Sequence, residues 1–556
     1  MINIMSRKLL SKLPKLSKDK IFNAKGGLVT GYTKHKDKEK IHYISDDLHT
    51  LIIGATRSGK TRSIILQTIC LLGLSGESMV ISDIKGELYD YTADSLRFLG
   101  YDVVALDFNE PLKSDRYNFL QPIIDLVAAD NVSKAIEYLW DFVKALVPSG
   151  KGEPIWENGE VSAIAGCIML AVLENMDNPQ FQNLTNVFYF LSYMGKADDK
   201  GIMPLDRYIS GLEDTHPAKG LFQAVMNAPF KTRGSFFISA ITTLRLFTLP
   251  FIYNMTNASD FEPVKTCKKK TAIFIILPYE RTTYHSLASL FCYSLYLELA
   301  IEANKRGGRI PVRVNYVLDE FGNFTKIPAF DNELSVGGGA GIRFNIVVQS
   351  FEQIEKVYGK EVAEIIKNNC HCLIYLMSNA LKTVEEISRR LDKYTTSAYS
   401  RSSSSSSYGG GNSTSSMNLI ARSLLTPSEV QSIKRPDVLV MLINHPPAMM
   451  KLPDISKQGF NTALGLGDMT HNQALRMIRG SNRPIRGDKK MELWGVWNYY
   501  NKSPINIPMT HEYMPDKPMT AYERDNMAGE GGYIFDEGVY CEDYTEADNG
   551  REKHVY

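Results

Sequence analysis

Residues 54–61 read Gly54-Ala-Thr-Arg-Ser-Gly59-Lys60-Thr61, and this stretch decides the fold. It follows the apolar run His49–Ile53 and opens a helical pattern that extends from Lys60 to Leu72. A glycine-bounded loop between a buried strand and a helix is the setting of the phosphate-binding loop of P-loop proteins. The stretch therefore predicts an α/β fold built around a phosphate site.

Each residue type in this loop suits phosphate. Gly54 and Gly59 allow backbone N–H groups to wrap closely around phosphate oxygens, and the following helix N-terminus favours negative charge. Lys60 supplies a point charge for the β- and γ-phosphates, and the Thr61 hydroxyl is placed for Mg²⁺. We therefore expect ATP and Mg²⁺ to bind here. The expected nucleotide-binding residues are Gly54, Ala55, Thr56, Arg57, Ser58, Gly59, Lys60, Thr61 and Arg62.

Two adjacent carboxylates follow a second apolar strand, Val314–Leu318. Asp319 is expected to hold Mg²⁺ together with Thr61, and Glu320 is expected to polarise the attacking water. Further along the chain, Phe344–Val348 ends in Gln349, whose amide is a candidate for sensing the γ-phosphate or orienting water. The expected catalytic residues are thus Lys60, Glu320 and Gln349, and the pattern favours hydrolysis over transfer to a small acceptor.

Short apolar runs alternate with helical patterns through most of the chain. Such alternation predicts a mostly parallel sheet covered by helices on both faces. The expected strands are Thr50–Ile53, Met79–Ser82, Val103–Leu106, Ala272–Leu277, Val312–Leu318, Phe344–Val348 and Leu373–Leu376. From about Ile123 to Phe261 the pattern is almost wholly helical, which predicts an inserted all-α domain.

The resulting domain division has five parts. Residues 1–40 form a basic N-terminal arm with a charge balance of +8. Residues 41–122 and 263–453 form the two halves of the nucleotide-binding domain, which flank an all-helical domain at 123–262. The second half contains a Ser/Gly-rich loop at 397–418, which we expect to be a mobile loop or a loosely formed hairpin. Residues 454–556 form a partly disordered tail, with a balance of −8 over 511–556.

Composition excludes several classes of protein. The 44% apolar and 22% charged residues are typical of a globular protein, and the net charge of +1 neither favours nor excludes nucleic acid. No uninterrupted apolar run approaches the roughly 20 residues that span a bilayer. The longest, Val161–Leu173, is better interpreted as a core helix. The seven cysteines show neither a disulfide framework nor zinc spacing.

Several segments in a fixed order make the chain similar to a known family. Beside the P-loop, these segments are Ser82-Asp-Ile-Lys-Gly-Glu87, Tyr117-Asn-Phe-Leu120, Leu318-Asp-Glu-Phe-Gly322, Val348-Gln-Ser350, Tyr358-Gly359, Asn368-Asn-Cys370 and Leu424-Leu-Thr-Pro-x-Glu429. With them, the sequence resembles the coupling proteins of conjugation and type IV secretion (TraG/TraD-like P-loop ATPases), which are relatives of the FtsK and HerA DNA pumps. These segments span about residues 45–455.

The resemblance implies a RecA-like motor domain that carries an all-helical domain. It also implies a homo-hexamer with ATP sites between subunits, a relaxase–DNA substrate, accessory proteins, single-stranded DNA and a type IV secretion channel as partners. The expected location is cytoplasmic, at the inner face of the membrane. Relatives usually begin with transmembrane helices, so membrane attachment is expected only through partners or through a missing N-terminal segment.

Two positions leave alternatives open. Many relatives place an arginine, acting across the subunit interface, where this chain has Gly337–Gly341. Arg343 is the nearest substitute, with Arg389 and Arg390 further away. Lys85 either contacts phosphate or DNA, or pairs with Glu87.

Three functions follow from these features. The first is a coupling ATPase that recruits a relaxase–DNA substrate and drives its transfer by ATP hydrolysis. The second is a nucleotide-binding docking adaptor with little turnover, and the third is an FtsK/HerA-like cytoplasmic translocase of double-stranded DNA.

Overall fold

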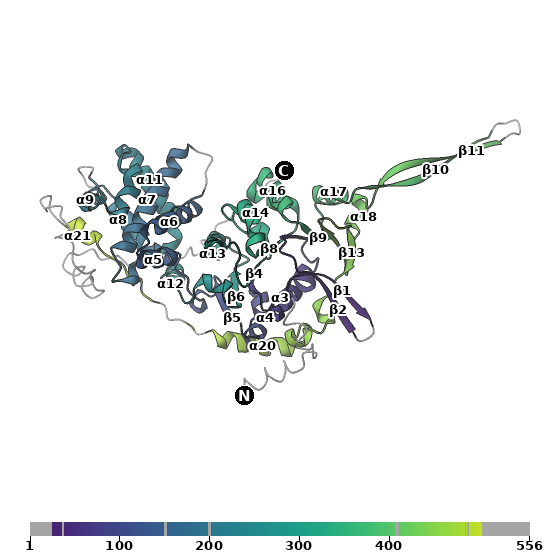
Figure 1. Ribbon diagram of the computed structural model, residues 1–556, viewed down its shortest axis with the longest axis horizontal. Coiled ribbons are helices and arrows are strands. Elements are labelled where there is room, and N and C mark those ends of the chain that lie inside the picture. The colour runs from purple at the N-terminus through teal and green to yellow at the C-terminus, as the bar shows by residue number, and fades with distance from the viewer. Residues whose placement is uncertain are drawn as a thin grey trace, which may run out of the picture.

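A nine-stranded sheet forms the centre of the computed structural model, which describes residues 25–35, 38–148, 153–197, 202–405, 411–483, 485 and 489–502 (Figure 1). The strand order is β13-β12-β9-β3-β8-β7-β4-β6-β5, and all neighbours from β9 to β5 pair in parallel. The strands are β3 (Thr50–Gly54), β4 (Ser78–Ile84), β5 (Asp102–Asp107), β6 (Thr271–Leu277), β7 (Val314–Leu318), β8 (Ile342–Val348), β9 (Cys372–Met377), β12 (Asp437–Leu442) and β13 (Ala448–Lys451). The seven strands expected from apolar runs are all present.

The sheet is buried on both faces, which explains its continuous apolar strands. Successive residues of β3 point to opposite sides, so Leu51 and Ile53 enter one core cluster while Ile52 enters the other. One face is covered by η1 (Thr61–Ile65), α3 (Leu66–Ser75) and α4 (Glu87–Phe98). The other face is covered by α13 (His285–Lys305), α14 (Phe330–Ala340), α15 (Phe351–Tyr358), α16 (Lys360–Asn369) and α17 (Leu381–Arg390). The expected parallel α/β domain is confirmed.

The helical interruption forms a second body beside the sheet (Figure 1). Its helices are α5 (Gln121–Ala128), α6 (Val132–Leu146), α7 (Pro154–Leu173), α8 (Leu184–Met194), α9 (Pro204–Gly211), α10 (Pro217–Met226), α11 (Phe230–Leu244) and α12 (Pro250–Thr256). The central helix α7 is buried nearly all round, and the rings of Phe236 and Phe222 lie against Gly159 and Gly166. A β-carbon at either glycine would lie within 2.5 Å of the ring, so this packing depends on glycine.

Within the part of the chain that the structure describes, two helices, α7 and α13, are long and apolar enough, by length and composition, to cross a membrane. The bent pair Phe230–Thr248 and Pro250–Thr256 passes the same test when its parts are counted together. In the fold, 78% of the apolar window of α7 and 61% of that of α13 is buried inside the protein.

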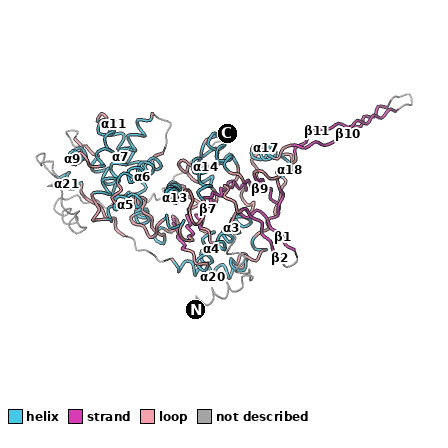
Figure 2. The backbone as a smooth tube through the Cα atoms, in the orientation of Figure 1, coloured by secondary structure: helices cyan, strands magenta, loops and turns pink. Residues whose placement is uncertain are grey.

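The Ser/Gly-rich segment differs from a simple loop. It forms β10 (Lys393–Ser405) and β11 (Gly411–Ser423), which pair antiparallel along their whole length and make a two-stranded sheet of their own. This arm projects away from the rest of the molecule (Figure 2). Serine gives no apolar strand pattern, so the composition predicted a flexible segment. In the structure, a ladder of backbone hydrogen bonds between the two strands holds the segment together.

Ordered structure also extends into both termini. Residues of the basic arm enter β1 (Leu28–His35), which pairs with β2 (Lys38–Ile44), whereas residues 1–24 lie outside the described part. After residue 453 the chain forms η7 (Ile455–Lys457), α19 (Asn461–Leu464), α20 (Met469–Asn482) and α21 (Trp497–Lys502). The acidic stretch 511–556 lies outside the described residues. The core therefore continues past the expected end at 453.

The described residues after 453 contact both the sheet domain and the helical domain. Helix α20 packs on α4, and Trp494 stacks on Phe190 with ring centroids 5.2 Å apart. Trp497 stacks in the same way on Tyr193. Both tryptophans are buried, so this segment ties the two domains together.

Candidate nucleotide-binding and hydrolysis site

The P-loop is closed at the carboxyl end of β3. The Ser58 amide donates to the Ala55 carbonyl at 2.9 Å, and the Ala55 amide donates to Met377 at the end of β9. Arg57 and Gly59 adopt left-handed backbone with φ of 66° and 87°. A β-carbon on Gly54 would lie 2.5 Å from Ser58 Oγ, so the strand meets its own loop too closely for a side chain. These contacts fold the loop into a compact turn, or cradle, at the end of β3.

The carboxylates lie beside this cradle because β7 is separated from β3 only by β8. Thr61 Oγ1 lies 3.4 Å from Asp319 Oδ2, so the two expected Mg²⁺ ligands face one another. Ser82, on the neighbouring strand β4, donates its hydroxyl to the Asp319 backbone carbonyl at 2.8 Å. Parallel strands bring all these groups to one edge of the sheet, where α/β proteins bind their ligands.

The three expected catalytic residues form one connected set. Lys60 Nζ donates to Glu320 Oε1 at 2.6 Å, and Gln349 Nε2 donates to Glu320 Oε2 at 3.0 Å. Glu320 occupies left-handed backbone with φ of 50°, which is costly for a residue with a side chain. Both oxygens of this carboxylate are thus held by neighbours in a strained turn, as expected of a positioned base.

Supporting groups hold Gln349 and Asp319 in turn. The Gln349 backbone N–H donates to Gln353 Oε1 at 2.8 Å, and the Gln349 backbone carbonyl accepts from Ser378 Oγ at 3.2 Å. Burial raises the pKa of Asp319 to about 6, a rise that Lys60 opposes and the Glu320 charge reinforces. A cation close to Asp319 therefore stabilises the ionised form of its carboxyl group.

A cleft of about 400 Å³ opens beside the carboxylates. Its walls are Thr61, Asp83, Ile84, Lys85, Glu87, Leu88, Tyr279, Thr282, His285, Asp319, Glu320, Asn323 and Gln349. Burial raises the pKa of Asp83 to about 7, which two backbone N–H donors oppose. Lys85 has left-handed backbone (φ 85°), and its ammonium lies 5.3 Å from the centroid of the exposed Tyr279 ring. Lys85 and Glu87, which both belong to the described residues and line this cleft, form no ion pair with each other.

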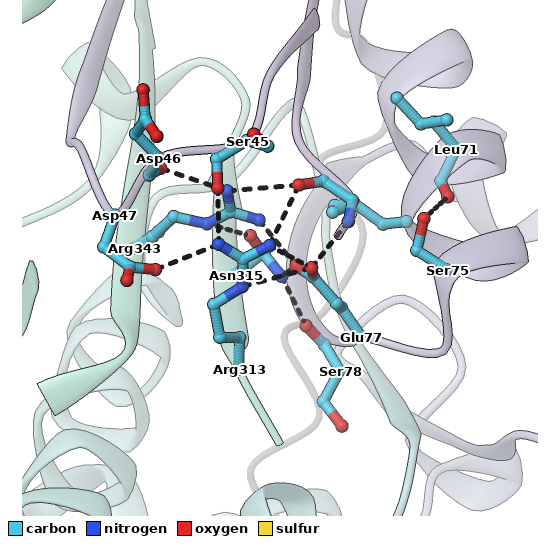
Figure 3. A network of polar contacts seen from close by, with 12 residues as sticks. Ser45, Asp46, Asp47, Leu71, Ser75, Glu77, Ser78, Arg313, Asn315 and Arg343 are labelled. Carbon is cyan, nitrogen blue, oxygen red and sulfur yellow. Dashed lines mark hydrogen bonds and ion pairs between the residues drawn. The ribbon is translucent and has the colours of Figure 1, made fainter. Parts of the chain in front are cut away.

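Arg343 lies at the opposite end of the sheet from this site. It is 3% exposed near the amino end of β8, and its Nη2 is 2.6 Å from Glu77 Oε2 (Figure 3). Its Nε donates to Asn315 Oδ1 at 2.7 Å, and Arg313 also pairs with Glu77. The side chain would have to break these bonds to reach a neighbouring subunit, so its position argues against a trans-acting role. Arg389 and Arg390 lie exposed in the last turn of α17.

Two contacts with the P-loop were not expected from the sequence. Arg435, in the loop before β12, donates from Nε to the Ser58 carbonyl at 2.5 Å and from Nη2 to the Arg57 carbonyl. Arg62, one of the expected nucleotide-binding residues, is paired with Asp454, with 2.8 Å between Nη2 and Oδ1. Both partners lie more than 370 residues away in sequence, and no local pattern could have identified them.

Comparison with known proteins identifies the family. The family described as "Type IV secretory system Conjugative DNA transfer" matches residues 7–453, most of the chain. The chain belongs to this family. The helices that follow residue 453 lie outside the residues that match this family.

Two relatives illustrate the similarity. The conjugal transfer protein TraG of Escherichia coli is 25% identical over 383 residues, which cover 65% of this chain and 58% of that protein. Protein VirD4 of Agrobacterium fabrum (strain C58) is 21% identical over 413 residues, which cover 72% of this chain and 58% of VirD4. The family member described here thus spans a little under three fifths of the length of these curated relatives.

Solved structures support the fold of this family member. The bacterial conjugative coupling protein TrwBdeltaN70, in an unbound form, matches with a TM-score of 0.54 and 16% identity over 79% of this chain and 91% of that one. TrwB in complex with the non-hydrolysable ATP analogue ADPNP matches with a TM-score of 0.53 and 16% identity over 74% of this chain and 86% of that one. The RecA-like sheet domain with a helical domain is therefore confirmed as the fold.

Proposed function

We propose that this chain is a coupling ATPase of conjugative type IV secretion, which uses ATP hydrolysis to drive the transfer of DNA. The observation that carries the proposal is the connected set of Lys60, Glu320 and Gln349 beside the Thr61–Asp319 pair. Membership of the conjugative DNA transfer family supports the same function.

The residues present fit ATP with Mg²⁺. The P-loop amides, Lys60 and Thr61 lie at the carboxyl end of β3, where the Lys60 ammonium contacts the Glu320 carboxylate. Ser58 Oγ is buried and has no hydrogen-bond partner among the described residues, so a polar group is still needed at the cradle. Thr61 and Asp319 supply the hydroxyl and carboxylate oxygens that Mg²⁺ prefers. TrwB, which shares the fold, has been solved with ADP and Mg²⁺.

The chemistry can be assigned residue by residue. Bound MgATP would supply a γ-phosphoryl group that is transferred to water with ADP as the leaving group, and the metal would neutralise the developing charge. Lys60 Nζ binds phosphate oxygens, and it releases Glu320 Oε1 when it does so. Gln349 keeps its hold on Glu320 Oε2, so the freed oxygen stays oriented to accept a proton from water. The Lys60–Glu320 ion pair is therefore the arrangement of the site before nucleotide binds. Glu320 becomes available as a base when Lys60 exchanges it for phosphate.

We further propose the partners that the family resemblance implies. These are a relaxase with its accessory proteins on single-stranded DNA, the secretion channel, and other copies of this chain in a homo-hexamer. The site of action would be the inner face of the cell membrane. None of the described residues that line the catalytic cleft is an arginine, which is consistent with a site completed by a neighbouring subunit.

A docking adaptor with little turnover is the second candidate. The observation that favours it is the short Lys60–Glu320 contact, which occupies both the phosphate-binding amine and the expected base. An adaptor would keep this contact when nucleotide binds, whereas a motor must break it. Turnover therefore separates the two functions.

The test is steady-state ATP hydrolysis by the purified chain, with and without single-stranded DNA, beside a mating assay. We expect DNA-stimulated hydrolysis that Lys60→Ala abolishes together with transfer. Lys265→Ala, which removes an exposed lysine paired with Glu262, is the matched control and should leave both unchanged. Transfer that survives Lys60→Ala would overturn the motor, and binding without turnover would favour the adaptor.

A further inference from the structure

The P-loop is held from outside by residues at the far end of the chain. β12 runs antiparallel to β9, so its first residue, Asp437, lies at the carboxyl edge of the sheet, where β3 also ends. β13 turns back and its last residue, Lys451, pairs with Asp437. The chain therefore enters and leaves this hairpin beside the P-loop, which places Arg435 just before it and Asp454 just after it.

Arg435 fixes two successive peptide groups. In a trans peptide the C=O and the next residue's N–H point in opposite directions. Because the Ser58 carbonyl accepts from Arg435 Nε, the Gly59 N–H must point away from Arg435, into the cradle. The Arg57 carbonyl accepts from Nη2 of the same guanidinium, so both planes are set by one rigid fork.

The contact also explains the glycine at position 59. A β-carbon there would lie 2.5 Å from Arg435 Cζ, so the guanidinium rests directly on the bare backbone. Gly59 also has φ of 87°, which L-residues with side chains rarely adopt. Loop shape and guanidinium position therefore depend on one another.

Asp454 holds the other side of the loop. Its carboxylate forms a two-point ion pair with Arg62, with 2.8 Å from Nη2 to Oδ1 and 2.8 Å from Nε to Oδ2. Arg62 follows Thr61 directly in the first turn of the P-loop helix, and Gln67 in the same helix donates to the Pro453 carbonyl at 3.0 Å. Asp454 also accepts from the Ser456 amide, which fixes its own orientation. The helix N-terminus that would face phosphate is thus anchored from outside.

We propose that Arg435 and Asp454 are positioning residues for nucleotide binding, which together hold the P-loop in its phosphate-binding shape before nucleotide arrives. The inference rests on the proposed nucleotide binding. Arg435 orients the Gly59 amide, and Asp454 holds the helix that carries Lys60 and Thr61. Neither side chain lies on the cleft beside Asp319 and Glu320, so the hydrolysis step itself does not depend on them.

The test is the Kd for MgADP, measured by calorimetry on the full chain, beside kcat and KM for ATP. Arg435→Ala loses two hydrogen bonds from a charged donor, and we expect Kd and KM to rise on the order of tenfold. Asp454→Asn keeps the cap on Ser456 but loses the charge, and we expect a rise of roughly threefold. For both variants kcat at saturating ATP should stay within about twofold, because ground-state and transition-state binding fall together.

Two further variants separate positioning from simple charge and from folding. Arg435→Lys keeps the charge but cannot bond both carbonyls, so it should recover less than half of the loss in affinity. Arg422→Ala removes an exposed arginine paired with Glu429, and Asp468→Asn changes the residue that caps α20; both should leave Kd unchanged. The melting temperature of each variant shows whether it is folded.

The outcomes are distinguishable. Wild-type protein that binds no MgADP would refute the proposed function itself. Wild-type binding with unchanged Kd in folded Arg435→Ala, or full recovery by Arg435→Lys, would refute the positioning role alone. A fall in kcat equal to that in kcat/KM would place Arg435 in the chemistry instead.

Discussion

The two ends of the central sheet hold similar charged residues in opposite circumstances. At the carboxyl end, Glu320 sits in strained backbone, is partly exposed beside a cleft, and shares its oxygens with Lys60 and Gln349. At the amino end, Glu77 is buried and accepts from Arg313, Arg343, Asn315 and the Gly26 amide (Figure 3). The Glu320 carboxylate can exchange its hydrogen-bond partners, whereas both oxygens of the Glu77 carboxylate are fully occupied by buried donors.

The difference shows what separates a reactive cluster from a structural one. Burial raises the pKa of Asp83 and Asp319 at the carboxyl end, because too few donors compensate for lost water. At the amino end burial also acts on Asp47, but Arg309 and Arg313 outweigh it and lower its pKa. Charge alone is therefore weak evidence of function; incomplete pairing beside a cleft is stronger evidence.

Glu320→Gln is expected to give the largest effect. Removing the base should lower ATP turnover on the order of 10²–10⁴-fold, since general-base catalysis contributes that much. The substitution leaves Lys60, Thr61 and the P-loop amides in place to bind phosphate, so MgADP affinity should stay within about threefold. The measurement is kcat beside calorimetric Kd. An unchanged kcat would show that the carboxyl end is as purely structural as the amino end.

Glu77→Gln should act on stability instead. The variant leaves two buried guanidinium groups facing an amide, and breaking a buried ion pair in this way costs about 3–5 kcal/mol. We expect that fall in the free energy of unfolding from urea titration, with kcat per folded molecule retained. Glu262→Gln, at an exposed pair with Lys265, is the control and should cost less than about 1 kcal/mol. Lost turnover in a stable, folded Glu77→Gln protein would contradict the comparison.

Asp83→Asn tests the pKa difference between the ends. The folded-state pKa of about 7 lies above the ordinary 3.8, so the folded chain retains a proton that the unfolded chain has released. The stability contributed by this carboxyl therefore falls as pH rises from about 4 to 7. The melting temperature of Asp83→Asn, relative to wild type, should be clearly higher at pH 8 than at pH 5.

Asp47→Asn is the matched variant for that measurement. Its carboxyl has a lowered pKa, so its stabilising contribution is already complete above the unfolded value of 3.8 and is lost only at lower pH. The deficit of Asp47→Asn should be the same at pH 5 and pH 8. Equal pH dependence for the two variants would show that the two ends do not differ in this respect.

The sequence predicted those parts of the fold whose signal is local. Seven strands were recognisable because each is buried on both faces and reads as a continuous apolar run. The P-loop and Asp319-Glu320 were recognisable because their chemistry requires fixed spacing after a strand. β12 was missed although Val438–Leu442 is itself an apolar run, whereas β13 was missed because it is a short and largely exposed edge strand.

The remaining features depend on contacts between distant segments. Arg435 and Asp454 reach the P-loop across more than 370 residues, and nothing in their own neighbourhood signals it. Arg343 was interpreted as a candidate for a subunit interface because it is the arginine nearest to Gly337–Gly341, where many relatives place one. A strand has two ends, however, and five residues of β8 separate Arg343 from the edge that carries Gln349.

Arg309→Ala is expected to give the smallest change in stability. It compares an exposed ion pair with a buried one at the amino end of the sheet. Arg309 Nη2 lies 2.6 Å from Asp47 Oδ2, yet its side chain is 46% exposed, whereas that of Arg313, which bonds the same carboxylate, is 7% exposed. Water and salt screen the first pair, so Arg309→Ala should cost less than about 1 kcal/mol of unfolding free energy. Arg313→Ala should cost several times more, because it leaves Glu77 partly unpaired in the core.

In 0.5 M NaCl (a concentration at which the Debye length falls to roughly 4 Å), the Arg309→Ala effect should vanish while that of Arg313→Ala persists. Equal costs for the two arginines would mean that a short contact, rather than burial, determines what a pair contributes at this end of the sheet.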